Sequence, residues 1–556
     1  MKKGEIIEGV VTGYEFPNKG VIVVDDVKVY IKNVLPGQKI KCMIRKKRQN
    51  KAQASLIEII EKAPIQTEEA FCKHFGNCGS CIYQTLSYDS QCAVKEKQVL
   101  DLINSVCSDY EYDGIKHNPD ILGYRNKMEY TFGDEYKDGP LSLGLHKRGS
   151  FYDILDASCC KLVNDDFGRI LTCVKDYCIE NDIPHYHRVS HEGVLRHLLV
   201  RRARKTGELL IDIVTADTDH DFGDLTKRLL DLNLEGSIVG FLHTTNNCIA
   251  DTIKDEGTEI LYGRDYFYEE LLGLRFRISP FSFFQTNSNG AEVLYSVARD
   301  YIGKYAEGKV VYDLYSGTGT IAQLLASASK QVIGVEIVPE AVEAAKKNAL
   351  DNGLCNCEFI AGDVLKTLDS IEVLPEVIVL DPPREGVHPK ALERIVSYGV
   401  ENIVYISCKP TSLVNDLKIM QENGYKVERV SMVDMFSWTG HVETVVLLSH
   451  KKPDSHINIK VEFGEGEGKV PLKAIAERAE AYKPKERVTY KMIKEYIEAK
   501  YGFKVHTAYI AEVKRDLGLP MYDAPNAVEE LKNPRKHPTA EKVEAIKDAL
   551  KYFEVI

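Results

Sequence analysis

Val310-Val-Tyr-Asp-Leu-Tyr-Ser-Gly-Thr-Gly-Thr320 is the stretch from which the fold of this chain is best predicted. Its apolar first half predicts a buried strand, and Gly317 and Gly319 allow the tight backbone turn that follows. We expect a helix after this turn, with its free N–H groups directed at a ligand. The same order of strand, turn and helix repeats from about 291 to 450, which predicts a doubly wound parallel sheet in an α/β domain.

Acidic residues follow the predicted strands of this domain. Glu336 ends the apolar run Gln331-Val-Ile-Gly-Val-Glu336, 17 residues after Gly319, where a carboxylate can bind ribose hydroxyls. The turn lacks the third glycine of a dinucleotide fingerprint, so the pattern favours S-adenosylmethionine over NAD.

Asp363 and Asp381 also stand at predicted strand ends, where ligands of open α/β sheets bind. For Asp363, a role as a helix N-cap or turn residue is the alternative. The two prolines after Asp381 stop the strand and fix the loop that follows.

Cys408 ends the apolar run Asn402-Ile-Val-Tyr-Ile-Ser-Cys408 in the same domain. A buried strand cysteine is usually only a small hydrophobic residue. It can also be a nucleophile: a thiolate that adds to C6 of a pyrimidine creates an enolate whose C5 attacks a methyl sulfonium. The adduct must then lose its C5 proton to a general base, and His441 and Glu443, just before an apolar strand, are both candidates.

Cys72-Lys-His-Phe-Gly-Asn-Cys78-Gly-Ser-Cys81 forms a loop in which glycines let several sulfur atoms face inward. A fourth ligand is needed, and the adjacent Cys159 and Cys160 are the candidates. Spacing alone does not separate a zinc site, in which His74 competes as a ligand, from an iron–sulfur cluster.

The bulk composition limits the class of protein. With 556 residues, of which 44% are hydrophobic, the chain has room for three or four domains, each with its own core. Neither a signal peptide nor an apolar run long enough to span a bilayer is evident, so we expect a cytoplasmic protein whose 14 cysteines are reduced. The net charge of −11 gives no global positive field for nucleic acid.

The composition divides the chain into four predicted domains. Residues 1–61 alternate as the short strands of a small β-barrel, and they resemble the TRAM domain, an OB-like RNA-binding module. Their basic stretch from Lys39 to Arg48 is either a solvated strand face or a surface that tracks phosphates. Residues 62–290 predict a central α+β domain, residues 291–450 the cofactor-binding domain, and residues 453–556 an appended helical domain.

In this last domain a helix is expected after Thr489, with Met492, Ile493, Tyr496 and Ile497 on one face and Gly502 as its terminator. A second helix is expected from Thr507. A packing or partner-binding role is favoured over a helix-turn-helix.

Five ordered motifs resemble those of the RNA uracil-5-methyltransferases that modify bacterial ribosomal and transfer RNA, and the resemblance covers residues 1 to about 450. The motifs are Ser282-Phe-Phe-Gln-Thr-Asn287, Asp313-Leu-Tyr-Ser-Gly-Thr-Gly-Thr320, Asp381-Pro-Pro-Arg-Glu-Gly386, Ile406-Ser-Cys-Lys-Pro410 and His441-Val-Glu443. The resemblance implies that Cys408 is the nucleophile and Glu443 the proton acceptor. It also implies a cofactor site made of Gln285, Tyr315, Thr320, Glu336, Asp363 and Asp381.

The resemblance further implies a 4Fe-4S cluster, which the ribosomal branch of the family carries, held by Cys72, Cys78, Cys81 and Cys160. Two positions depart from the family pattern: Lys409 replaces an asparagine, and Ser437 replaces a proline before Trp438. The expected activity is methylation of uridine C5, with 23S ribosomal RNA as the substrate. The alternatives are a transfer RNA uridine-5, cytosine-5 or amine methyltransferase, and a non-catalytic RNA-binding or assembly factor.

Overall fold

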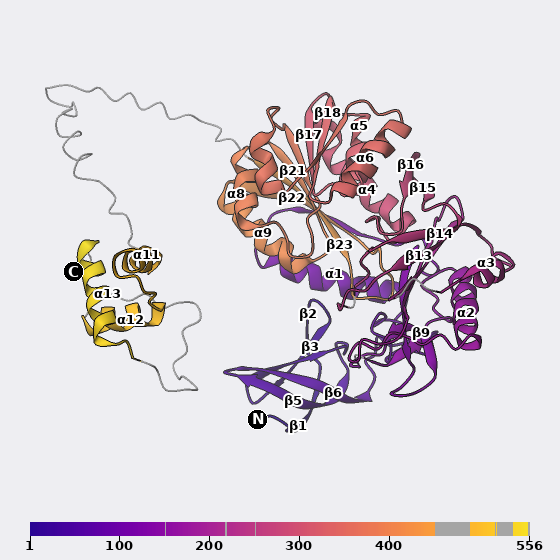
Figure 1. Ribbon diagram of the computed structural model, residues 1–556, viewed down its shortest axis with the longest axis horizontal. Helices are drawn as coiled ribbons and strands as arrows, with labels where there is room; N and C mark the ends of the chain where they lie inside the picture. The colour runs from indigo at the N-terminus through magenta and orange to yellow at the C-terminus, as the bar shows by residue number, and fades with distance from the viewer. Residues whose placement is uncertain are drawn as a thin grey trace. The chain divides into compact units, whose positions relative to one another are not determined.

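The computed structural model describes residues 1–150, 152–216, 220–250, 252–450, 490–517, 519 and 537–553. The chain separates into two compact units, residues 1–454 and 455–556 (Figure 1). The first unit contains three larger sheets and a small hairpin, whereas the described part of the second is helical. No helix in the described ranges is both long and apolar enough to cross a bilayer.

The N-terminal sheet has the strand order β1-β5-β6-β4-β3-β2. Its strands are β1 (Ile6–Val10), β2 (Gly13–Glu15), β3 (Lys19–Val24), β4 (Val27–Lys32), β5 (Lys39–Arg48) and β6 (Lys51–Glu61). In β5 the apolar residues Ile40, Cys42 and Ile44 are fully buried, because alternate side chains of a strand point to the same face. The basic end of β5, from Arg45 to Arg48, is exposed.

The central sheet has the order β10-β9-β8-β11-β12-β13-β14. Its strands are β8 (Lys127–Asp134), β9 (Leu141–His146), β10 (Ile154–Asp156), β11 (Leu195–Arg202), β12 (Glu208–Thr215), β13 (Ser237–Thr245) and β14 (Thr258–Gly263). Only β12 and β13 pair in parallel among these described strands. Helices α2 (Asp165–Glu180) and α3 (Gly223–Leu230) pack against it through Phe167, Ile170 and Leu225. The hairpin of β15 (Phe267–Leu271) and β16 (Leu274–Ile278) follows.

The doubly wound sheet has the order β19-β18-β17-β20-β21-β23-β22-β7. Its strands are β7 (Glu111–Lys116), β17 (Val310–Leu314), β18 (Gln331–Glu336), β19 (Cys357–Ala361), β20 (Val377–Leu380), β21 (Asn402–Ser407), β22 (Tyr425–Val433) and β23 (Glu443–His450). Strands β17 to β21 run in parallel, whereas β23 is antiparallel to both of its neighbours. The sheet recruits β7 from far upstream, which pairs in parallel with β22.

Helices cover both faces of this sheet (Figure 1). One apolar cluster contains residues of α4 (Ser288–Ala306), α5 (Thr320–Ala326) and α6 (Pro339–Asp351). The other contains residues of α1 (Tyr88–Asn104), α7 (Val364–Thr367), α8 (Pro389–Ser397) and α9 (Pro410–Glu422). The prediction of a doubly wound α/β domain is therefore confirmed.

The second unit contains α11 (Tyr490–Tyr501), α12 (Thr507–Asp516) and α13 (Ala540–Tyr552). Their common core includes Ile493, Ile497, Ile510 and Ile546. Gly502 follows α11 with a φ of +75°, as the sequence predicted for a helix terminator. Thr489 and the predicted start of the appended domain at 453 lie outside the described residues.

Candidate active site

Cys408 lies at the carboxyl edge of the doubly wound sheet, between β21 and α9. Ser407 of β21 is paired with Thr444 of β23, so the next residues along the two antiparallel strands are Cys408 and Glu443. Cys408 is half-buried, and Glu443 is only 5% exposed. The fold therefore brings the predicted nucleophile and the predicted base together.

The charges around Cys408 act in opposite directions on its thiol. Burial, and then the negative charges of Glu443 and Asp381, raise the pKa of Cys408 to about 11. The guanidinium of Arg384 opposes this rise, because it makes a hydrogen bond with the thiol and favours the thiolate. The positive end of α9, which begins two residues later, acts in the same direction as Arg384.

Glu443 has the electrostatic character of a general base. Burial and the charge of Asp381 raise the pKa of Glu443 to about 8, while Arg384 lowers it. A carboxylate with a pKa near the working pH accepts a proton efficiently. By contrast, burial and the charges of Arg384, Lys95 and Arg125 lower the pKa of His441, the alternative base, to about 4.

Sequence reasoning assigned no role to Arg384, although it lies inside a motif that was singled out. The loop around it is fixed against α9: Ser412 Oγ donates to the Arg384 carbonyl at 2.7 Å. Asp416 accepts from the backbone N–H of Val387 at 2.9 Å, and a Cβ on Gly386, whose φ is +84°, would lie 2.7 Å from Asp416 Oδ2. Only glycine at position 386 allows the backbone to lie this close to Asp416. This contact fixes the loop that holds Arg384 at the thiol.

The glycine-rich turn after β17 has the conformation that its sequence predicts. Gly317 and Gly319 both have positive φ, 53° and 73°. A Cβ on Gly319 would lie 2.6 Å from the ring of Phe359, so only glycine fits. Glu336 accepts from the backbone N–H of Gly317 at 3.0 Å, and the buried Ser316 hydroxyl has no hydrogen-bond partner in the described part of the chain.

Buried acids continue from this turn toward Cys408. Burial raises the pKa of both Asp313 and Asp381 to about 7, and the charge of Asp381 contributes to the shift of Asp313. Asp313 Oδ2 accepts from Ala322 N at 2.9 Å, while its buried Oδ1 has no partner among the described residues. The phenol of Tyr295 makes a hydrogen bond with Gln285 and lies near Asp381 and Asp313.

Asp313 and Tyr295 lie in the candidate site, but neither residue was predicted from the sequence to be a site residue. A signal for Asp313 existed, because it is an acid inside an otherwise apolar strand. No comparable signal marks Tyr295, which stands on a helix among other apolar residues.

The remaining predicted cofactor residues surround the same sheet edge. Tyr315 follows β17 with a φ of +68°, and burial raises its pKa to about 12, with a contribution from the charge of Asp363. Thr320 is the first residue of α5. Asp363 accepts from Lys366 N at 3.3 Å as the N-cap of α7, which is the structural role that the sequence left open. Acids, a glycine turn and unpartnered buried oxygens suit a ligand rich in hydroxyl and amino groups, such as S-adenosylmethionine.

A cavity of about 390 Å³ is lined by Cys72, Cys78, Cys81, Cys159 and Cys160. Burial raises the pKa of Cys81 to about 12, with contributions from Cys160, Cys78 and Cys72. No three His, Cys, Asp or Glu side chains in the described ranges converge closely enough to hold one metal ion. His74 lies with its Nε2 2.9 Å from the carbonyl of Asp156, so that nitrogen is already engaged. Five cysteines nevertheless line this one cavity, and thiolates are ligands that both zinc and iron–sulfur clusters accept.

Comparisons with known proteins agree with this geometry. Residues 247–451 match the family model described as tRNA (Uracil-5-)-methyltransferase. Proteins described as uncharacterized RNA methyltransferases from Clostridium tetani and Clostridium acetobutylicum are 45% and 46% identical to this chain. Each alignment covers 81% of the chain and 99% of the relative. A relative from Bacteroides thetaiotaomicron with the same description is 37% identical over 77% of the chain and 98% of its own length.

Among solved structures, the Pyrococcus abyssi tRNA (uracil-54, C5)-methyltransferase in complex with S-adenosyl-L-homocysteine has a TM-score of 0.63. It is 24% identical and covers 80% of this chain and all of its own, so the likeness concerns the fold. The relatives, the matched family model and the site at the edge of a methyltransferase sheet lead to one conclusion: the chain belongs to the family of S-adenosylmethionine-dependent RNA uracil-5-methyltransferases.

Proposed function

We propose that this enzyme methylates uridine C5 in 23S ribosomal RNA through a covalent bond between Cys408 Sγ and uracil C6, with Glu443 as the general base. The observation that carries the proposal is the position of Cys408 and Glu443 at the ends of two neighbouring strands, with Arg384 at the thiol. A protein that only binds RNA has no need for this combination.

The residues divide the reaction between them. Arg384 favours the Cys408 thiolate, which adds to C6 and leaves C5 as an enolate carbon that can attack a methyl group. S-adenosylmethionine, when bound, supplies that methyl group. The Glu443 carboxylate then takes the proton from C5, the C5–C6 double bond re-forms, and Cys408 leaves as a thiolate.

Each predicted cofactor residue has a proposed task. The backbone of the glycine turn, braced by Glu336, holds the cofactor's nucleoside, together with Tyr315, Thr320 and Asp363. Gln285 and Asp381 lie on the side of Cys408, where they orient the methyl donor and the uracil ring. Their positions beside Tyr295 and Glu443 support this division.

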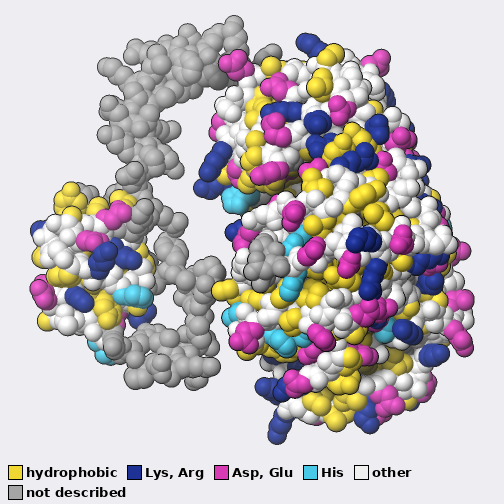
Figure 2. All heavy atoms as spheres, turned by 45° about the vertical axis from the view of Figure 1, so that its right-hand side comes forward, with side chains coloured by type: hydrophobic (Ala, Val, Ile, Leu, Met, Phe, Trp, Pro, Cys, Tyr) yellow, Lys and Arg dark blue, Asp and Glu magenta, His cyan; other side chains and the backbone are white. Residues whose placement is uncertain are grey.

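RNA binding is assigned to the N-terminal sheet, which we interpret as an OB-like barrel of residues 1–61. Residues 62–290 are taken as the central domain and 291–450 as the methyltransferase domain, to which α1 and β7 of the upstream segment also contribute. The exposed Lys46, Lys47 and Arg48 at the end of β5 suit the phosphate backbone. On the face shown in Figure 2, acidic and basic side chains are otherwise interspersed. Because Cys408 is itself half-buried, the uridine must leave its stack to reach it.

The cysteine cavity is proposed to hold a 4Fe-4S cluster through Cys72, Cys78, Cys81 and Cys160. The cluster would supply a cross-link between two distant chain segments. Cys160 is favoured over Cys159 as the fourth ligand, because Cys160 and Cys81 pack against the same apolar cluster of Tyr124, Leu162 and Trp438.

Replacement of Cys160 by serine is expected to remove most of the iron and the broad visible absorbance of the anaerobically purified protein, because one cluster thiolate is lost. Cys159→Ser is the matched control, one residue away, and should keep both. Iron content and absorbance spectra test this directly. Equal loss in the two variants, or stoichiometric zinc in place of iron, would contradict the assignment.

Deletion of the gene is expected to remove 5-methyluridine from 23S ribosomal RNA, and the wild-type gene, but not one encoding Cys408→Ala, should restore it. Mass spectrometry of nuclease fragments from ribosomal and transfer RNA locates the modification. Loss of 5-methyluridine from transfer RNA alone would assign the enzyme to that substrate. Loss of 5-methylcytidine would show that the base is different.

A further inference from the structure

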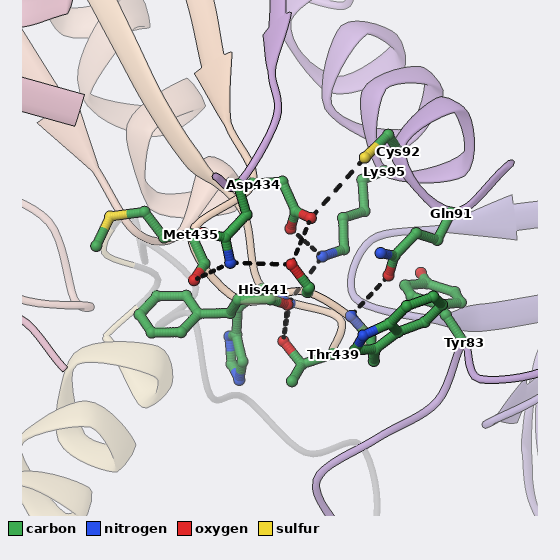
Figure 3. A network of polar contacts seen from close by, with 12 residues as sticks. Tyr83, Gln91, Cys92, Lys95, Asp434, Met435, Thr439 and His441 are labelled. Carbon is green, nitrogen blue, oxygen red and sulfur yellow. Dashed lines mark hydrogen bonds and ion pairs between the residues drawn. The ribbon is translucent and has the colours of Figure 1, made fainter. Parts of the chain in front are cut away.

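The loop of residues 434–442, here called the base loop, connects β22 to β23, whose first residue is Glu443. Its first residue, Asp434, is fully buried and accepts from Lys95 Nζ of α1 at 2.5 Å (Figure 3). Tyr88 and Ser437 also donate to Asp434, at 2.9 and 3.3 Å. Removing one partner of such a buried pair would leave a buried charge without its counter-ion, so the start of the base loop is firmly anchored.

The middle of the base loop is held by the segment that follows Cys81. The carbonyl of Trp438 accepts from the backbone N–H groups of Ile82 and Tyr83, at 2.8 and 3.2 Å, and these residues directly follow Cys81. The N–H of Trp438 donates to Gln91 Oε1 at 2.7 Å. Trp438 has a φ of +68°, a conformation that a bulky residue keeps only where its surroundings impose it.

The indole of Trp438 completes the connection between the two loops. Its Nε1 donates to the Ile121 carbonyl at 2.7 Å, and the ring meets the edge of Phe71, the residue before Cys72, at a centroid distance of 5.5 Å. The same apolar cluster contains Cys81 and Cys160. The indole is only 7% exposed, so it fills the space between the two chain segments that supply the proposed metal ligands.

The cysteine cavity itself reaches the base loop, because Thr439 forms part of its wall. Thr439 Oγ1 donates to the Phe436 carbonyl at 2.8 Å and accepts from His441 N at 3.2 Å. Between Trp438 and Glu443 there are therefore only four residues, and the first of them is already in contact with the cavity.

We propose that Trp438 is a positioning residue that couples the filling of the cysteine cavity to the placement of Glu443. A filled cavity fixes the segment around Cys81, which fixes the carbonyl and ring of Trp438, and the base loop then presents Glu443 opposite Cys408. An empty cavity frees that segment, so the base shifts although the nucleophile stays in place. The inference rests on the proposed function, because it takes Glu443 as the base and the cavity as a metal site.

The first test compares Trp438→Ala with Trp438→Phe in the full-length, anaerobically purified enzyme. The alanine variant is expected to lose about 100-fold in kcat, because a base displaced by about 1 Å is costly, with little change in KM for RNA. The covalent protein–RNA adduct should accumulate, since proton removal is the step that fails. Phenylalanine keeps the ring contacts and should turn over near the wild-type rate without adduct.

A merely structural role for Trp438 predicts a different result. Binding of S-adenosylhomocysteine and activity would then fall together, no adduct would accumulate, and the proposal would be overturned. Wild-type turnover by the alanine variant would overturn it as well.

The second test needs no variant, because Trp438 is the only tryptophan of the chain. Removing the metal from the wild-type protein with a chelator under mild oxidation should strengthen its fluorescence and shift the emission to longer wavelength. Quenching by acrylamide should rise at the same time. Unchanged emission and unchanged quenching after complete metal loss would contradict the coupling.

The two tests also separate this inference from the proposed metal site. If the purified wild-type protein contained neither iron nor zinc, the proposed cluster and its coupling to Trp438 would be excluded. The adduct measurement would still decide whether Trp438 positions Glu443. If the variant Glu443→Gln formed no adduct, Glu443 would not be the base, and both the proposed function and this inference would fail.

Discussion

Cys408→Ala is expected to abolish RNA methylation, by at least about 10⁴-fold, and to leave S-adenosylmethionine binding intact. The loss is expected to be this large because uracil C5 has no other means of becoming a nucleophile at this site, and removing a covalent catalyst disables the whole sequence of steps. The cofactor-binding turn is unaffected, since it lies at β17 and α5 rather than at β21.

Transfer of labelled methyl groups from S-adenosylmethionine to a ribosomal RNA transcript measures the activity, and calorimetry with S-adenosylhomocysteine measures binding. Cys355→Ala is the matched control, because Cys355 is an exposed cysteine of the same domain and should be dispensable. Substantial turnover by Cys408→Ala would eliminate the covalent mechanism.

Glu443→Gln is expected to convert most of the enzyme into a covalent complex with RNA. The glutamine has the shape of the protonated acid but cannot accept the C5 proton, so the methylated adduct forms and Cys408 cannot leave. A denaturing gel shows the complex as a slowly migrating band, and mass spectrometry locates the added nucleotide on the peptide that contains Cys408.

His441→Gln tests the alternative base in the same assay. With a pKa of about 4, His441 is a weak base, so its variant should release methylated product and show no band. The double variant Cys408→Ala, Glu443→Gln should also show none. A band from His441→Gln, with none from Glu443→Gln, would exchange the two roles.

The sequence predicts those parts of the fold that depend on short stretches of chain. The glycine turn after Leu314 and the parallel strands of the doubly wound sheet were predictable, because apolar runs, glycines and strand-end acids follow one another locally. The family was likewise predictable from the five ordered motifs, and the comparisons confirm that prediction.

Long-range partners were not predictable, because nothing in the local pattern marks them. Lys95 and Asp434 are 339 residues apart, and a lysine on a helix is normally a solvated residue. Arg384 is similar: its position at the Cys408 thiol depends on the loop packing against Asp416, which only the folded chain reveals. Ser437, a departure from the family pattern, likewise accepts from Asn118 at 3.0 Å in the buried network.

The strand β7 has a consequence for how this protein can be divided. A fragment that began near residue 291 would lack both β7 and Lys95, leaving β22 as an open edge and Asp434 as a buried charge without its cation. Open edges pair with strands of other molecules, so such a fragment would aggregate rather than fold as an isolated catalytic domain. The smallest soluble piece with a complete sheet must therefore begin upstream of Lys95.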